Sequence, residues 1–114
     1  MRWPLEQNQM TENKLMHLIQ LAASKLGARL FRNNVGLAKT VAGQVVKFGL
    51  CKGSSDLIGW TRSGRFLAVE TKSQRGRPSK EQLAFVDAVN SAGGVGMIVR
   101  SVEEFESEYK RRLG

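Results

Sequence analysis

The sequence predicts a single α/β domain in which helices pack on a mixed central β-sheet. With 114 residues, the chain is long enough for one core and too short for two independent cores. Apolar residues recur at helical spacing near both ends, whereas the middle of the chain holds short β-rich runs separated by turn residues. A sheet covered by helices is the simplest closed arrangement of such elements, so we expect residues 1–114 to form one domain.

A first helix is predicted over residues 12–26. In the segment "TENKLMHLIQLAASKLG", Thr11 suits the N-cap and Gly27 suits the stop signal. The apolar positions at helical spacing are Leu15, Leu18, Ile19, Ala22 and Leu26. We expect this face to pack on the sheet.

Two further helices are predicted in the second half of the chain. In "SKEQLAFVDAVNSAGG", Ser79 is the expected N-cap, Gln82 completes a capping box, and the glycines end the helix. In "SVEEFESEYKRRL", Ser101 and Glu104 repeat the capping-box spacing, and acidic residues precede basic ones, as the helix dipole favours. The expected buried face of the earlier helix consists of Leu83, Val86 and Val89.

The strands are predicted from the short β-rich runs. "ARLFRNN" and "VGMIV" are typical of single strands, and "GLAKTVAGQVVKFGL" of a hairpin that turns near Ala42 and Gly43. "DLIGW" and "RFLAVETK" flank "TRSG", where Gly64 supplies the positive φ that a short hairpin loop often needs. This second hairpin pairs Trp60 with Phe66, and we expect both rings in the core.

The distribution of charge favours a polyanionic partner. The net charge is +8; residues 1–60 carry eight Lys and Arg against three acids, residues 61–80 six against one, and residues 81–114 four against six. A positive field of this kind attracts nucleic acid, the commonest polyanion of a cytoplasm. The plainer alternative is that the charge only keeps the protein soluble.

Cysteine usage and the N-terminus indicate a cytoplasmic protein without membrane association. Cys51 is the single cysteine and His17 the single histidine, so neither an internal disulfide nor a zinc site of clustered Cys and His is expected. The first residues lack the apolar run of a signal peptide, and no run approaches the roughly 20 apolar residues of a membrane span.

The second hairpin is expected to place two scarce acidic residues opposite each other. If it is symmetric about Ser63, paired residue numbers sum to 126, and Asp56 faces Glu70. Side chains alternate along a strand, so Lys72 lies on the same face as Glu70, roughly 7 Å farther along. Like charges opposed in a sheet are destabilising, and a divalent cation held by both carboxylates would offset that cost.

This arrangement predicts a metal site for phosphodiester cleavage. Mg²⁺ or Mn²⁺ between the two acids would lower the pKa of a bound water, and Lys72 would position that water or the phosphate. Each residue also has an ordinary explanation. Asp56 could be a turn residue that bonds nearby backbone, and Glu70 with Lys72 could be a surface pair on an edge strand. A register slip of one residue would separate the acids.

"GSSDLIG", followed fourteen residues later by "ETK", resembles the bipartite signature of the PD-(D/E)XK nuclease superfamily. Over about residues 11–106, the segments "TENKL", "FRNNVG", "KFGLCKGSSDLIGW", "RFLAVETKSQRGRPSKEQLAFVDAV" and "AGGVGMIVRSVEEF" resemble the virus-type replication-repair nuclease (VRR-NUC) family. The resemblance implies a restriction-endonuclease-like core of order α-β-β-β-α-β. "LCKG" departs from the family pattern, which more often has a proline before the glycine, and this affects loop shape rather than the ligands.

The resemblance also implies roles for individual residues. By this likeness, the metal ligands are Glu12, Asp56, Glu70 and the Thr71 carbonyl, and the catalytic residues are Asp56, Glu70, Lys72 and Gln82. Without the resemblance, the helix dipole explains Glu12 and the capping box explains Gln82.

Candidate DNA contacts surround the motif. The nearest polar and basic residues are Arg32, Asn33, Asn34, Lys52, Arg75, Arg77 and Lys80, and groups of this kind usually contact phosphates. Because Arg75 and Arg77 flank Gly76, we expect a mobile basic loop there, unless the segment is only a solvated connector.

Together these observations predict a Mg²⁺- or Mn²⁺-dependent DNA endonuclease that acts on branched DNA such as Holliday junctions, with a phage or prophage as a possible source. Minimal members of the family are similar to Holliday-junction resolvases and act as dimers. A four-way junction has two equivalent strands to cut, so a two-fold homodimer would match it, with the first helix or the "VGMIV" region as its contact. The alternatives are a non-catalytic nucleic-acid-binding module of the same fold and a protein-interaction domain that is basic for solubility.

Overall fold

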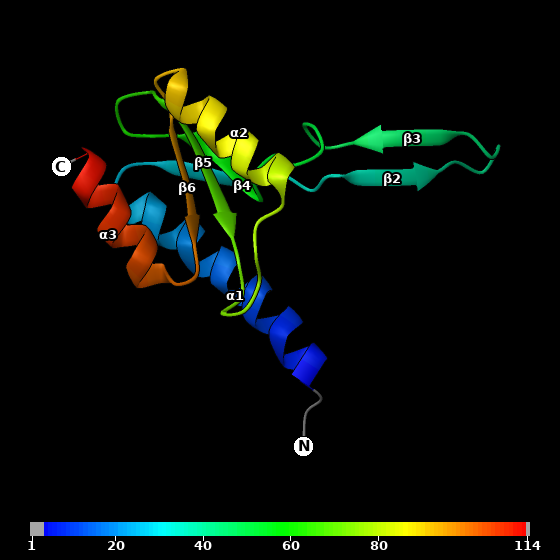
Figure 1. Ribbon diagram of the computed structural model, residues 1–114, viewed down its shortest axis with the longest axis horizontal. Helices are drawn as coiled ribbons and strands as arrows, with labels where there is room; N and C mark the ends of the chain where they lie inside the picture. Colours follow the sequence, from blue (N-terminus) through cyan, green and yellow to red (C-terminus); the bar gives the residue numbers. More distant parts are fainter. Residues whose placement is uncertain (1–3, 114) are drawn as a thin grey trace.

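The computed structural model describes residues 4–113 and has the predicted α/β architecture (Figure 1). In chain order the elements are α1 (Pro4–Lys25), β1 (Arg29–Arg32), β2 (Gly36–Lys39), β3 (Val45–Phe48), β4 (Leu57–Trp60), β5 (Phe66–Thr71), α2 (Lys80–Ser91), β6 (Val95–Val99) and α3 (Val102–Leu113). No helix in this described part of the chain is both long and apolar enough to cross a membrane.

Four of the strands form a mixed sheet in the order β1-β4-β5-β6. β1, β4 and β5 are antiparallel neighbours, whereas β6 runs parallel to β5. A parallel neighbour requires a crossover, and α2 provides it between β5 and β6. Because β5 has neighbours on both sides and helices over both faces, five of its six residues are buried.

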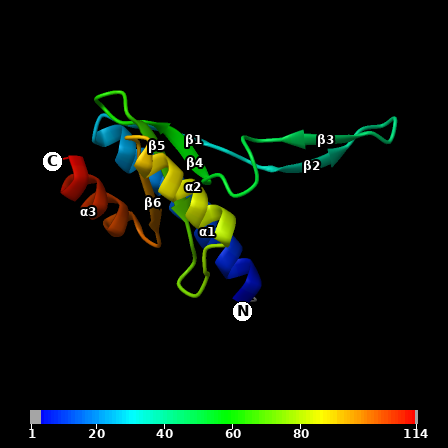
Figure 2. The same ribbon diagram turned by 45° about the horizontal axis from the view of Figure 1, so that its top comes forward.

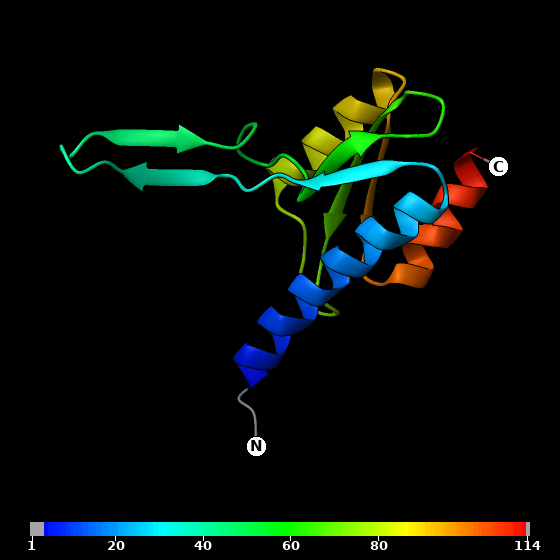
Figure 3. The ribbon, with the colours of Figure 1, turned by 180° about the vertical axis from the view of Figure 1, so that it is seen from behind.

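β2 and β3 form a separate two-stranded ribbon that extends away from the body, as Figure 2 and Figure 3 show. We call this hairpin, residues 36–48, the arm. It turns at residues 41–43, with Gly43 at a φ of +85°, as the sequence predicts. All four residues of β3 are exposed, so the arm has no packing partner within the described chain.

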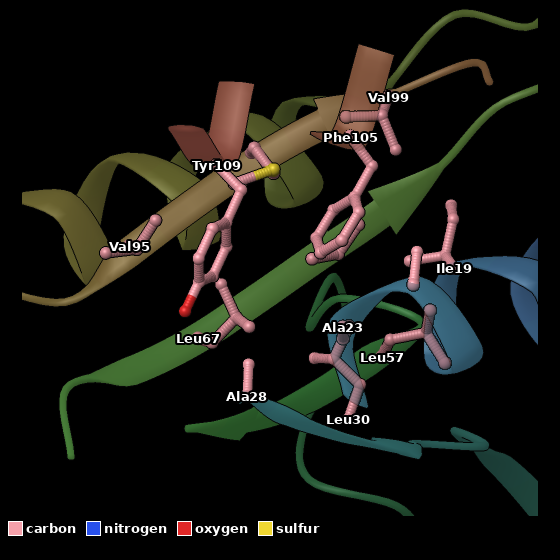
Figure 4. Close-up of a cluster of buried hydrophobic side chains, with 13 residues drawn as sticks. Ile19, Ala23, Ala28, Leu30, Leu57, Leu67, Val95, Val99, Phe105 and Tyr109 are labelled. Atoms are coloured by element: carbon pink, nitrogen blue, oxygen red, sulfur yellow. The ribbon is translucent and has the colours of Figure 1, made fainter. Parts of the chain in front are cut away.

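The main core lies between one face of the sheet and the helices α1 and α3 (Figure 4). Leu67 and Val69 of β5 face this side, where Ile19 of α1 and Phe105 of α3 are completely buried. The alternate residues of β5, including Glu70, therefore face α2 on the other side of the sheet. α2 lies close to β6, since a Cβ at Gly96 would come within 3.0 Å of the Val86 carbonyl oxygen.

The first helix is longer than the sequence predicts. α1 begins at Pro4, so Thr11 lies inside the helix and is not its N-cap. Proline is well tolerated in the first turn of a helix, where its missing N–H has no partner to lose. The apolar pattern that suggested a start near residue 12 marks the part of the helix that packs on the core, beginning at Leu15 and Met16. The end is as predicted, with Gly27 at a φ of +86°.

The capping predictions for the other two helices hold, with one difference. Both hydrogen bonds of the Ser79–Gln82 capping box are present in α2. At α3, the N–H of Glu104 donates to Ser101 Oγ, but the Glu104 carboxylate accepts from the N–H of Arg100 rather than from that of Ser101. The reciprocal bond is therefore displaced by one residue.

Four apolar side chains expected to be buried are exposed, and one of them is Leu18 of α1, with 39% of its surface accessible. Trp60 and Phe66 pair in the predicted register, but 49% and 42% of their surfaces are accessible, and the Trp60 ring contacts Phe31 instead. α2 packs over β5 and β6 and leaves the outer face of β4 open. Leu83 of α2 is also exposed, although Val86 and Val89 on the same helix are buried as predicted.

Candidate active site

The β4–β5 hairpin brings Asp56 and Glu70 together. Cα partners run from Trp60–Phe66 to Leu57–Val69, so every pair of residue numbers sums to 126 as predicted. One step farther, the backbone N–H of Asp56 donates to Glu70 Oε1 over 3.2 Å. The two carboxylates therefore lie at the same end of the sheet, where β4 begins and β5 ends.

Glu70 is the most deeply buried charged side chain of this group, at 2% accessibility. Its Oε2 accepts a hydrogen bond from Gln82 Nε2 at 2.8 Å and lies 3.5 Å from Lys72 Nζ. Burial, with a further contribution from the nearby Asp56 carboxylate, raises the pKa of Glu70 to about 7, even though the Lys72 ammonium acts in the opposite direction. Glu70 in the metal-free protein is thus a carboxyl group that holds its proton close to neutral pH.

Asp56 is held by the residue that follows Glu70. Its Oδ2 accepts from the backbone N–H of Thr71 at 3.1 Å and from the Thr71 hydroxyl at 2.9 Å. Thr71 therefore fixes the orientation of the Asp56 carboxylate through two donors. Among the described residues, Oδ1 of Asp56 has no hydrogen-bond donor, so this oxygen is available to a ligand.

Gln82 joins the site to the start of α2. Its Oε1 accepts from the N–H of Ser79 at 2.8 Å, its N–H donates to Ser79 Oγ at 3.1 Å, and its Nε2 reaches Glu70. The capping role and the site role that the sequence left as alternatives are therefore compatible, because the two ends of one amide serve them separately.

Asn33 holds the loop that leads into Asp56. Its Nδ2 donates to Ser54 Oγ at 2.7 Å and to the Ser55 carbonyl at 3.0 Å, and its Oδ1 accepts from the N–H of Leu50. Its backbone N–H also donates to the Asp56 carbonyl at 2.8 Å. Since both ends of the Asn33 amide are bonded within the protein, the geometry gives Asn33 a role in positioning the loop. The sequence suggested only a DNA contact for this residue.

An open cavity of about 420 Å³ adjoins Asp56 and gathers several predicted residues. Its lining includes Asn33, Asn34, Lys52, Asp56 and Gln82. Lys52 is highly exposed and lies 3.8 Å from the Glu81 carboxylate, a contact too solvated to restrain it strongly.

The remaining predicted residues do not line this cavity. The Arg32 guanidinium donates to the side chain and the carbonyl of Asn13 on α1. Glu12 precedes Asn13 on α1, and no group of three or more Asp, Glu, His or Cys side chains able to hold a metal occurs among the described residues. The role of Glu12 as a ligand therefore stays a prediction. Lys80 is exposed at the first position of α2.

Arg75 and Arg77 line a different cavity together with Arg100, a residue that sequence reasoning missed. Arg100 directly follows β6, and the carboxyl ends of parallel strands meet at the same edge of a sheet. Had the parallel pairing of β5 with β6 been predicted, it would have placed Arg100 near Lys72.

The donor set at Asp56 and Glu70 fits a hard divalent cation. Mg²⁺ is usually held by one or two carboxylates and several waters rather than by a complete protein cage, so two acids suffice. Two adjacent carboxylates, one of them buried and with its pKa raised, also form an electrostatically costly pair that a cation would stabilise. Thr71 and Gln82 hold both groups in place without a metal.

The fold has known counterparts. A solved structure described as a VRR_NUC domain has a TM-score of 0.62 and 16% sequence identity, over 91% of this chain and 98% of that chain. The chain therefore shares the fold of that domain. The model of the VRR-NUC domain family matches residues 11–103, and the chain belongs to this family. No curated protein matches the sequence significantly.

Proposed function

We propose that the protein is a Mg²⁺- or Mn²⁺-dependent deoxyribonuclease that hydrolyses phosphodiester bonds in branched DNA such as Holliday junctions. The observation that supports this most directly is the cluster of Asp56, Glu70 and Lys72, in which the Asp56 N–H bonds to Glu70 and Lys72 Nζ lies 3.5 Å from the same carboxylate. This cluster lies in a chain of net charge +8 that belongs to the VRR-NUC family. A positive surface attracts DNA, and two carboxylates beside a lysine suit phosphodiester hydrolysis.

The side chains of the site have different proposed roles. Asp56 and Glu70 would hold the cation, which when bound supplies Lewis acidity for the phosphate and the attacking water. Lys72 carries a positive charge beside them on a side chain that is 19% accessible, so it can contact a phosphate oxygen or orient the attacking water. Gln82 and Thr71 keep the carboxylates in fixed orientations through their hydrogen bonds. The Thr71 carbonyl and Glu12 are further proposed ligands.

Cleavage of a panel of labelled DNAs tests the proposal. Linear, flap and four-way substrates are incubated with wild type, Asp56→Asn, Glu70→Gln and Lys72→Ala, with Mg²⁺ or Mn²⁺ and with EDTA. We expect the four-way substrate to be cut fastest by wild type, only with metal, and all three variants to fall to background while still binding DNA. Metal-independent binding without any cleavage by the wild type would favour a non-catalytic nucleic-acid-binding module.

A second copy of the chain is the proposed protein partner. The arm exposes apolar side chains that have no cover within the described chain: Leu37 and Val45 are 66% and 65% accessible, and alternation places both on one face of the ribbon. The sequence suggested α1 or the β6 region as the contact, whereas the exposed apolar surface makes the arm a better candidate. Light scattering during size exclusion would give twice the 12.6 kDa chain mass if the dimer forms.

A further inference from the structure

A second cavity lies beside the candidate active site and is bordered by three arginines. It measures about 690 Å³, and its lining includes Arg75 and Arg77 from the loop between β5 and α2, Arg100 after β6, and the apolar residues Pro78 and Leu83. No acidic residue lines it. We call this cavity the arginine pocket.

The charges of the arginine pocket are not neutralised within the part of the chain that the structure describes. The ion pairs of the described residues involve the cations Lys52, Lys72, Arg111 and Arg112. None of them joins a carboxylate to the pocket arginines. Neighbouring guanidinium groups repel one another, and an anion shared by them removes that cost. Guanidinium groups also match phosphate oxygens in a bidentate geometry.

Arg100 is already oriented for such a role. Its guanidinium donates to the Ser73 carbonyl, and its backbone N–H donates to the Glu104 carboxylate, so neither end of the residue is free to swing. The residue is half-buried, which lowers the local solvent screening and strengthens its interaction with an anion. Arg75 and Arg77 are exposed and can close on the same ligand from the loop.

The arginine pocket adjoins the cluster of carboxylates and lysine through the backbone. The N–H of Lys72 donates to the Val99 carbonyl at 3.0 Å, and Ser73 and Arg100 directly follow these two residues in the chain. The loop that carries the two exposed arginines also folds back on the lysine, since a Cβ at Gly76 would lie 3.5 Å from Lys72 Cδ. A strand whose scissile phosphate lies at Lys72 would therefore also lie beside the arginine pocket.

We infer that Arg75, Arg77 and Arg100 bind a phosphate of the nucleic-acid strand that neighbours the phosphate at Lys72. This inference rests on the proposed function for the identity of the substrate. It assigns the pocket a positioning role: it holds the strand in register with the candidate metal site. Two kinds of phosphate have the required chemistry, an internal phosphodiester and a terminal 5′-phosphate.

Binding without metal tests the inference separately from cleavage. The affinity of fluorescent four-way and single-stranded DNA is measured in EDTA over a range of salt concentrations, for wild type, Arg77→Gln, Arg100→Gln and the control Arg62→Gln. Arg62 is an exposed arginine in the turn at the opposite end of β5, so its variant loses the same charge away from the pocket. We expect about tenfold weaker binding for each pocket variant, and a salt slope smaller by about 1 than that of the control variant.

A scan of the DNA identifies the phosphate. Single phosphates are replaced by neutral methylphosphonates, and the loss of affinity is compared between wild type and the exposed variant Arg77→Gln, whose folding is checked by circular dichroism. One methylphosphonate replacement should weaken DNA binding by wild type but not by Arg77→Gln. The same replacement should weaken binding by Arg62→Gln as much as it weakens binding by wild type. If a 5′-phosphorylated end gives the coupling, the ligand is a terminal phosphate; if an internal position does, it is a phosphodiester.

The inference is overturned if both pocket variants bind with the affinity and salt slope of Arg62→Gln, or if no methylphosphonate couples to Arg77. Those results are independent of activity. A wild type that binds as expected but never cleaves would refute the nuclease proposal alone, and variants that bind like the control while the wild type cleaves would refute the arginine pocket alone.

Discussion

Glu70→Gln should change how the stability of the metal-free protein depends on pH. The folded state raises the pKa of this carboxyl from 4.5 to about 7. An unfolded chain therefore releases the proton near pH 4.5, whereas the folded protein keeps it until about pH 7. Between these values the folded state binds more protons, so the stabilisation is complete below pH 4.5 and is lost as the pH rises through 7.

The magnitude follows from the difference of about 2.5 between 4.5 and 7. At about 1.4 kcal/mol per pKa unit, wild type should lose about 3 kcal/mol of unfolding free energy across this range, relative to a variant that cannot ionise at this position. For a domain of this size that is a fall of roughly 10 °C in Tm.

Urea unfolding in EDTA at a series of pH values measures this loss. Glu70→Gln keeps the length of the side chain and should show a flatter profile than wild type. Glu103→Gln is the matched control, because it removes an exposed carboxylate in the first turn of α3 and should leave the wild-type slope intact. Parallel profiles for wild type and Glu70→Gln would refute the reasoning, because burial and the Asp56 carboxylate would then not penalise the ionised form.

Other substitutions test the remaining contacts. Gln82→Ala removes both the reciprocal cap and the bond to Glu70, so urea unfolding should show a loss of about 2 kcal/mol, and cleavage should weaken. Asn33→Ala loses three side-chain hydrogen bonds and should also cost about 2 kcal/mol. Gly59→Ala would place a Cβ 1.9 Å from the Arg29 carbonyl oxygen, so it should force β1 from β4 and lower stability by about 3 kcal/mol or more; unchanged unfolding would contradict this packing. Leu37→Asp on the arm should shift the mass in light scattering from dimer to monomer without changing the circular dichroism spectrum.

Local rules were sufficient for the parts of the molecule that depend on short stretches of chain. The four-residue segment between Trp60 and Arg65 and the alternation of β5 fix the register of the hairpin, and this register places Asp56 opposite Glu70. The capping box of α2 is likewise a contact between residues three apart. The two central acids of the candidate site could therefore be identified before any long-range contact was known.

Predictions about burial were weaker, because burial depends on which elements cover which. Apolar residues at Trp60 and Leu83 match the pattern of a core, but α2 covers β5 and β6 only, and both side chains stay exposed. Similarly, the apolar pattern of α1 marks the part of the helix that packs on the core. It says little about residues 4–11, the eight residues by which the helix extends beyond its predicted start.

The sequence by itself determined the family resemblance and the order of elements. It also determined the register of the β4–β5 hairpin and the pairing of Asp56 with Glu70, since these two features are set by residues close together in the chain. Only the tertiary structure decided that Asn33 holds the loop before Asp56, that Gln82 both caps α2 and bonds to Glu70, and that Arg100 joins Arg75 and Arg77 around one cavity. These contacts join residues from 12 to 25 positions apart. Their geometry follows from the pairing of β1 with β4, the parallel pairing of β5 with β6 and the packing of α2, which no local pattern encodes.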